Sequence, residues 1–156
     1  MLEATIKQTE PMTVAYIAMR GAYSQIAEGY GSLYGWIAQH GLQATGMPQA
    51  VYLTSPADTP ESEALFELWA PVASTEELAP DASDVGIKHV PSTTVASTMF
   101  TGPYDAMYPT YESLRAWIEG QGYRIAGPPS EIYYSDPAEV PPEQYVTEIV
   151  FPVSKL

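Results

Sequence analysis

The stretch that decides the fold occurs twice, as MTVAYIAMRGAYSQIAEGYGSLYGWIAQHG at 12–41 and as TTVASTMFTGPYDAMYPTYESLRAWIEGQG at 93–122. When the chain is shifted by 81 residues, positions 6–72 align with 87–153 without a gap, and 22 of the 67 pairs are identical. Self-similarity at a fixed period indicates a repeated structural unit. The sequence therefore predicts one domain, 1–156, made by tandem duplication, with repeats at about 1–75 and 82–156.

Both repeats show the same order of strand and helix signals. Runs of β-branched and apolar residues that stop at Gly predict strands at 12–21 and 93–102, with shorter candidates before them at 2–8 and 85–90. Apolar positions then recur at helical spacing, at Ile26, Tyr30, Leu33 and Ile37 and again at Met107, Tyr111, Leu114 and Ile118. Each repeat thus predicts an amphipathic helix that follows its long strand.

The ends of the helices carry their own signals. Ser24 is a candidate N-cap for the first helix, and Gly41 and Gly122 stand where C-cap glycines belong. Pro109 is compatible only with a first helical turn, which predicts that the second helix begins near Tyr108.

Two further strands are predicted in each repeat, at 49–53 and 64–70 and then at 130–134 and 145–151. Proline-rich links at 55–61 and 135–143 separate them. The predicted fold class is α+β. A strand–helix–strand–strand unit occurs twice, and a short strand precedes each copy. We expect the two halves to be related by a pseudo-twofold axis.

Composition excludes several classes of function. Six Lys and Arg against nineteen Asp and Glu give a net charge of −13, which disfavours direct binding to nucleic acid or to an anionic membrane surface. The chain has no Cys, so thiolate chemistry and Cys-type zinc sites are excluded. No apolar run is long enough to span a bilayer, and the N-terminus does not resemble a signal peptide. We expect a cytoplasmic protein without a metal ion or cofactor.

A glutamate interrupts an apolar strand in each repeat, Glu67 in ALFELWA and Glu148 in YVTEIVF. Because side chains alternate along a strand, Glu67 shares a face with Leu65 and Trp69, and Glu148 shares a face with two valines. Ionised carboxylates are costly to bury without a partner, and ligand pockets are mostly apolar with a few polar groups. Either glutamate therefore faces a ligand pocket, accepts hydrogen bonds from the facing half, or lies on a half-exposed edge strand.

The motifs GPY (102–104), YESLRAWIEGQGY (111–123), GPPSEIYYSDP (127–137) and TEIVFPV (147–153) resemble the GyrI-like small-molecule-binding superfamily. This superfamily includes effector-binding domains of AraC- and MerR-type multidrug regulators and stand-alone proteins. The resemblance implies a groove between the halves that binds hydrophobic, often cationic aromatic molecules. By this resemblance Glu148 supplies a buried negative charge. The other candidate ligand-binding residues are Glu67, Trp69, Tyr133, Glu131, Tyr16 and Tyr104.

The resemblance leaves more than one function open. Some stand-alone members resemble hydrolases that open cyclopropane-bearing alkylating compounds, in which case Glu148 would be the catalytic base that activates water. Such members often carry an aromatic residue two positions after the last-strand glutamate, where this chain has Val150 and the first repeat has Trp69. A third possibility is an interaction protein that acts on a macromolecular target. We expect burial to raise the pKa of Glu148 and a bound cation to lower it again.

Overall fold

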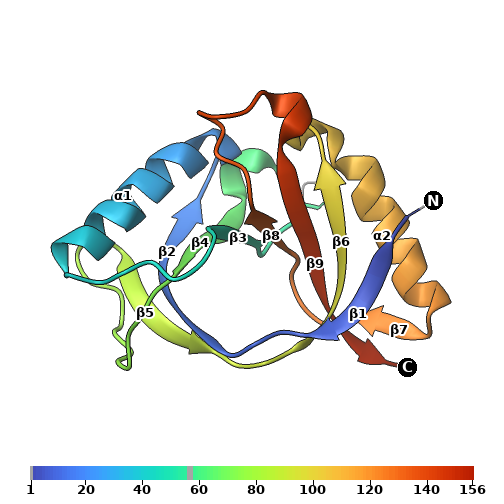
Figure 1. Cartoon of the computed structure of the whole chain (residues 1–156), viewed down its shortest axis with the longest axis horizontal. Coiled ribbons are helices and arrows are strands. Elements are labelled where there is room, and N and C mark those ends of the chain that lie inside the picture. Colours follow the sequence, from blue (N-terminus) through green and yellow to red (C-terminus); the bar gives the residue numbers. More distant parts are fainter. Residues whose placement is uncertain (1, 56–57) are drawn as a thin grey trace. The chain divides into compact units, whose positions relative to one another are not determined.

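A computed structural model describes residues 2–55 and 58–156 (Figure 1). Pro56 and Ala57, which belong to the predicted link at 55–61, lie outside the described residues, as does Met1. The chain divides into Pro11–Pro91, here called the central unit, and Met1–Glu10 with Ser92–Leu156, here called the terminal unit.

The central unit contains a four-residue strand, three longer strands and a helix. They are β2 (Met12–Arg20), α1 (Ile26–Gln39), β3 (Gln49–Tyr52), β4 (Leu65–Pro71) and β5 (Val85–Val90), with short 3-10 turns η1 (Tyr23–Gln25) and η2 (Glu61–Glu63). The strands pair in the order β3-β4-β2-β5, and every pairing is antiparallel. β4 and β2 are therefore the inner strands of this sheet.

The terminal unit is built in a similar way. Its elements are β1 (Ala4–Gln8), β6 (Thr94–Thr101), α2 (Tyr108–Gly120), β7 (Tyr123–Ile125), β8 (Ser130–Tyr133) and β9 (Val146–Lys155), with the turns η3 (Tyr104–Ala106) and η4 (Pro142–Gln144). The strand order is β1-β6-β9-β8, all antiparallel, and β7 pairs with the far end of β9. Antiparallel sheets with a helix in each unit confirm the α+β class.

Each unit takes its first strand from the other sequence repeat. Figure 1 shows β1, in blue at the start of the chain, beside β6 in yellow, and the two strands pair from Ala4 opposite Thr98 to Gln8 opposite Thr94. β5, which aligns with β1 in the repeat, pairs instead with β2. The units are therefore not the contiguous repeats, and this exchange of strands was not predicted.

The helices follow the predicted faces. Leu33 and Ile37 of α1 and Leu114 and Ile118 of α2 are buried. α2 begins at Tyr108 as predicted, and Gly41 and Gly122 have φ of +67° and +80°, the left-handed conformation of a helix end. The predicted cap at Ser24 is wrong, because Ser24 lies inside η1 and no side chain caps α1. The short strand β7 was also missed.

Each helix covers one face of its sheet. In the terminal unit, buried Ala96, Ile149 and Phe151 from the strands pack against Met107, Leu114 and Ile118. In the central unit, Gly29 brings α1 so close to β4 that an added Cβ would lie 2.6 Å from Leu68 Cδ1. Within the described residues, no helix is long and apolar enough to cross a membrane. The opposite face of each sheet carries one of the two glutamates, Glu67 on β4 in the central unit and Glu148 on β9 in the terminal unit.

Candidate functional site

Glu67 lies on the inner strand β4 and faces a lysine. Lys88 Nζ donates to Glu67 Oε1 at 2.6 Å, and Trp69 Nε1 donates to the same oxygen at 2.8 Å. The strand register explains these contacts, because β2 places Val14 opposite Lys88 and Ala18 opposite Glu67 on one face of the sheet. Lys88 Nζ also lies 4.3 Å from the ring centroid of Tyr16 and 4.9 Å from that of Trp69. Three predicted residues thus surround one ammonium group.

Glu148 occupies the matching place on β9 in the terminal unit. Lys7 Nζ donates to Oε2 at 2.6 Å, Ser97 Oγ donates to Oε2 at 2.5 Å, and Tyr134 Oη donates to Oε1 at 2.6 Å. The Glu148 side chain is only 5% exposed, whereas that of Lys7 is 46% exposed. Glu148 is therefore a buried carboxylate with three donors, one of which reaches it from the surface.

The hydrogen bonds of Glu148 decide its ionisation. Burial raises its pKa, but the hydrogen bonds from Lys7, Ser97 and Tyr134 and the charge of Lys7 outweigh this effect, so the pKa of Glu148 lies below its ordinary value. The expected effect of burial on the pKa of Glu148 is present, and the ammonium group of Lys7 has the lowering effect expected of a cation. Burial together with Glu148 in turn raises the pKa of Tyr134 to about 12. At neutral pH the site holds a carboxylate and a phenol.

Glu131 and Tyr133 share a strand face, but it is not the face of Glu148. In the pairing of β8 with β9, Ile132 lies opposite Glu148, while Glu131 lies opposite Ile149. Glu131 accepts hydrogen bonds from Tyr111 Oη on α2 at 2.5 Å and from Tyr133 Oη at 2.8 Å. The structure therefore places Glu131 and Tyr133 on the side of the sheet that α2 covers.

Tyr104 belongs to the same side as Tyr133. Its ring centroid lies 5.6 Å from that of Tyr133 in an edge-on contact and 4.9 Å from that of Tyr145 in a stacked contact. The predicted site residues consequently form separate groups: Glu67, Trp69 and Tyr16 in the central unit, Glu148 in the terminal unit, and Glu131, Tyr133 and Tyr104 on its helix-covered side.

The donors to the two glutamates were missed by sequence reasoning. Lys7 and Lys88 align in the 81-residue repeat, but neither these lysines nor Ser97 and Tyr134 were predicted as site residues. A signal was present, because the chain has Lys at only 7, 88 and 155, and two of these positions match across the repeat.

The sequence left open that either glutamate lies on a half-exposed edge strand. This option is wrong, since β4 and β9 are inner strands.

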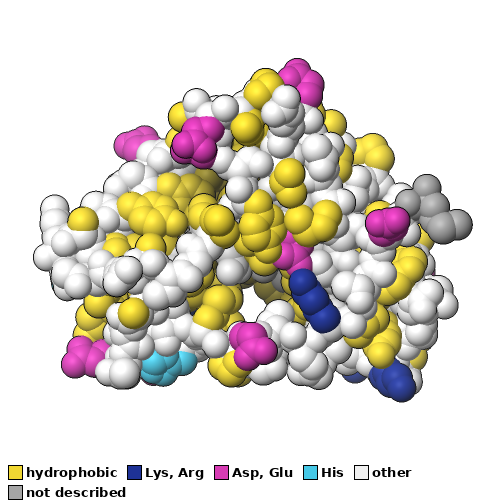
Figure 2. All heavy atoms as spheres, viewed as in Figure 1, with side chains coloured by type: hydrophobic (Ala, Val, Ile, Leu, Met, Phe, Trp, Pro, Cys, Tyr) yellow, Lys and Arg dark blue, Asp and Glu magenta, His cyan; other side chains and the backbone are white. Residues whose placement is uncertain are grey.

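Apolar side chains remain accessible around these charged groups. Figure 2 shows one face of the molecule, on which hydrophobic side chains are exposed in several areas with charged side chains scattered among them. Near Glu148, Met99 lies directly opposite it on β6 and is 53% exposed, and Tyr134 is 42% exposed. A ligand beside Glu148 could therefore make hydrophobic contacts as well as an electrostatic one.

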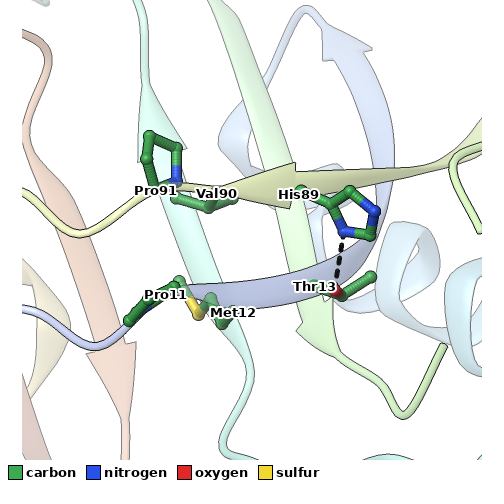
Figure 3. A pocket seen from close by; sticks show the side chains of 6 residues that line it. All are labelled: Pro11, Met12, Thr13, His89, Val90 and Pro91. Carbon is green, nitrogen blue, oxygen red and sulfur yellow. Dashed lines mark hydrogen bonds between the residues drawn. The ribbon is translucent and has the colours of Figure 1, made fainter. Parts of the chain in front are cut away.

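Two shallow hollows are lined by other residues than the glutamates. In the central unit, Pro11, Met12, Thr13, His89, Val90 and Pro91 line a hollow in which His89 Nδ1 and Thr13 Oγ1 lie 2.8 Å apart (Figure 3). The other lies in the terminal unit along β1 and includes Lys7 and Lys155. Neither hollow contains a predicted site residue. Within the described residues, no group of three or more His, Asp and Glu is placed to hold a metal ion.

The sequence matches the family model of the GyrI-like small molecule binding domain over residues 3–154. The chain belongs to this family, as the motifs predicted. No curated protein sequence matches the chain.

Solved structures share its fold. EcmrR in a complex with DNA is 21% identical, with a TM-score of 0.85; the match covers 99% of this chain and 58% of that one, so the chain spans little more than half of EcmrR. The C-terminal domain of EcmrR is 22% identical over 99% of both chains, with a TM-score of 0.80.

Two further structures are similar over almost the whole chain. A hydrolase from Listeria innocua is 15% identical, with a TM-score of 0.74, and the match covers 97% of this chain and 92% of the hydrolase. SAV2435, solved bound to tetraphenylphosphonium, is 16% identical, with a TM-score of 0.61, and the match covers 98% of this chain and 94% of SAV2435. At these identities the likeness shows the fold alone.

Proposed function

We propose that the protein binds hydrophobic, often cationic aromatic small molecules, with the buried carboxylate of Glu148 as a principal source of negative charge. The observation that carries this proposal is an ionised carboxylate on an inner strand, flanked on the same face by the exposed side chains of Met99 and Tyr134. A lipophilic cation needs both kinds of contact, because burial of its apolar surface stabilises the complex and a carboxylate offsets the lost hydration of its charge.

The ion pair of Glu148 with Lys7 is compatible with the binding of a cationic ligand. Lys7 reaches Glu148 from an edge strand, and its side chain is nearly half exposed, so its ammonium group can return to water when another cation arrives. The family match and the cationic ligand of SAV2435 support the same class of ligand. The net charge of −13 favours the approach of cations.

The hydrolase alternative receives less support. A general base works best when its pKa lies near the working pH, and the pKa of Glu148 is instead lowered by its three donors. The hydrolase from Listeria innocua is similar in fold only. We therefore propose ligand binding without turnover, and we propose no macromolecular partner.

We also infer an internal duplication. It is supported by the 81-residue repeat and by the lysine–glutamate pair that recurs at matching positions, Lys88 with Glu67 and Lys7 with Glu148. The strand orders β3-β4-β2-β5 and β8-β9-β6-β1 also correspond element by element.

Calorimetric titration with tetraphenylphosphonium tests the binding function. We expect saturable binding to the wild-type protein and an affinity at least tenfold lower for Glu148→Gln, which keeps the size of the side chain but removes its charge. Glu119→Gln is the matched control, because Glu119 is an exposed residue of α2 and the substitution changes the net charge equally. An absence of saturable binding to the wild type, or an equal loss in the two variants, would contradict the proposal.

A further inference from the structure

The surroundings of the Lys88 ammonium group in the central unit have the form of a cation-binding cage. The carboxylate of Glu67 is in contact with Nζ, and the rings of Tyr16 and Trp69 both lie within 5 Å of it, at 4.3 and 4.9 Å. Aromatic faces within about 6 Å of a cation attract it through their quadrupoles. The hydrogen bond from Trp69 Nε1 to Glu67 holds the indole beside the carboxylate.

A glycine on the neighbouring strand leaves room for the ring of Tyr16 in this cage. Tyr16 lies opposite Gly86 in the pairing of β2 with β5. A Cβ at Gly86 would lie 3.1 Å from Tyr16 Cε1 and 2.7 Å from the carbonyl oxygen of Leu78. Glycine at this position therefore allows the tyrosine ring to lie close against the β5 backbone.

The terminal unit has the charges of this arrangement but lacks its aromatic walls. The positions that match Tyr16 and Trp69 in the repeat are Ser97 and Val150. Ser97 donates a hydrogen bond to Glu148, which is nearly inaccessible at 5% exposure, whereas Glu67 is 19% exposed. The ion pair between Lys88 and Glu67 would not by itself require the rings of Tyr16 and Trp69. These rings therefore distinguish the ion pair of the central unit from that of the terminal unit.

We propose that Glu67, Trp69 and Tyr16 form a binding site for ammonium-bearing ligands, which Lys88 occupies as an internal, displaceable cation. The Lys88 side chain is 33% exposed, so its ammonium group can leave the cage for water while its stem stays on β5. The inference deepens the proposed function and rests on it for the cationic nature of the ligand. It adds a second site, with a preference for compact alkylammonium groups that fit between two rings.

Tetramethylammonium is a suitable probe, because it is a compact cation that binds aromatic cages and cannot donate hydrogen bonds. We expect Lys88→Met to bind it at least tenfold more tightly than the wild type, as measured by NMR of the Trp69 indole N–H. The matched control is Lys155→Met, which removes an exposed lysine at the end of β9 and should not tighten binding. In Lys88→Met/Trp69→Leu the gain should be lost, with binding followed by the tetramethylammonium methyl signal.

A second measurement uses the wild-type protein and does not depend on the folding of a variant. Saturating tetramethylammonium should expel Lys88 and raise its rate of acetylation by an amine-reactive reagent relative to that of Lys155, as measured by mass spectrometry. The proposal is overturned if Lys88→Met gains no affinity, if Lys155→Met gains as much, or if Lys88 acetylation is unchanged at saturation. Failure of tetraphenylphosphonium to bind, with these results intact, would instead overturn only the function proposed for Glu148.

Discussion

Glu148 stays ionised although its side chain is almost completely buried, because Lys7, Ser97 and Tyr134 all donate to it. In the central unit, Glu67 is more exposed and accepts hydrogen bonds from Lys88 and Trp69 at one oxygen. The glutamates at matching positions therefore differ: Glu148 accepts three hydrogen bonds at its two oxygens, whereas Glu67 accepts two at one oxygen.

The ionisation of Glu148 predicts how stability depends on pH. Because the pKa of Glu148 is lower in the folded than in the unfolded state, its stabilising contribution is present above its ordinary value of 4.5 and is lost as the pH falls through the folded pKa. At neutral pH we expect Glu148→Gln to lower the free energy of unfolding by about 2 kcal/mol, a typical loss for hydrogen bonds to a charged group. Urea denaturation should show this difference shrinking below pH of about 4; a constant difference would contradict the assignment.

The phenol of Tyr134 provides an independent check on the same site. Burial and the hydrogen bond to Glu148 raise its pKa to about 12. In Glu148→Gln we expect the pKa of Tyr134 to fall toward the ordinary value of 10.0, because the negative charge that opposes its ionisation is gone. An NMR titration of the tyrosine ring carbons measures this change. Glu131→Gln is the control, since Glu131 lies on the other face of the sheet and should leave Tyr134 unaffected.

Single positions were predictable where alternation along a strand was clear. The predicted division of β4 holds, with Ala64, Phe66, Leu68 and Ala70 buried and with Leu65, Glu67 and Trp69 more exposed. The partners of the glutamates were not predictable in the same way. Lys7 and Lys88 come from strands distant in sequence, and alternation within β4 or β9 says nothing about which strand lies beside it.

At the scale of elements, α1 shows how a helix with three internal glycines is tolerated. An added Cβ at Gly29 would lie 2.6 Å from Leu68 Cδ1 and 3.1 Å from Met19 Cε, whereas Gly31 and Gly35 have open space around them. Gly29 therefore permits the close packing of α1 on β2 and β4, and the other two glycines serve no such contact in the described residues.

These glycines should respond oppositely to alanine. Gly29→Ala gains helix propensity, but the crowded Leu68 and Met19 must shift, so we expect it to lower the free energy of unfolding by about 1 kcal/mol, in the range known for overpacked cores. Gly31→Ala and Gly35→Ala meet no atom within 4 Å and should raise it by up to about 1 kcal/mol. Thermal denaturation of the three variants decides the matter. Stabilisation by Gly29→Ala equal to that of the controls would show that the helix–sheet contact is loose.

Elements with long periodic patterns were the most predictable. Helical spacing identified both helices and Pro109 placed the start of α2, while Gly41 and Gly122 marked the helix ends. β7 was missed because Tyr123–Ile125 is too short to show alternation, and its pairing with the end of β9 is a long-range contact. The cap at Ser24 failed because η1 takes up the residues before α1.

At the scale of the whole molecule, the exchange of first strands separates the structural units from the sequence repeats. A repeat pattern is the same whether its first strand pairs within its own repeat or in the other one, so the sequence alone could not reveal the exchange. The structure shows that β5, with Lys88, completes the sheet of β2, β4 and β3, and that β1, with Lys7, completes that of β6, β9 and β8. Each ion pair therefore depends on the exchanged strand.

This organisation predicts where the chain can be divided. The central unit is contiguous, so a fragment of residues 11–91 contains every strand of its sheet together with α1. A fragment of residues 1–81 has the same length and includes the whole first repeat, but it replaces β5 by β1, which pairs elsewhere in the native chain. Losing β5 would expose the edge of β2, including buried Val14 and Ala15, and would leave Glu67 without Lys88.

We expect the 11–91 fragment to unfold cooperatively in urea and the 1–81 fragment to show no cooperative transition, or one at a clearly lower urea concentration. A chain of about 80 residues is only marginally stable, so a difference of one strand decides the outcome. Adding Val14→Asp to the 11–91 fragment should abolish its transition, which shows that the transition reports this sheet. Equal stability of the two fragments would mean that β1 can replace β5 beside β2, and that the assignment of first strands follows from the intact chain rather than from the sequences of the strands.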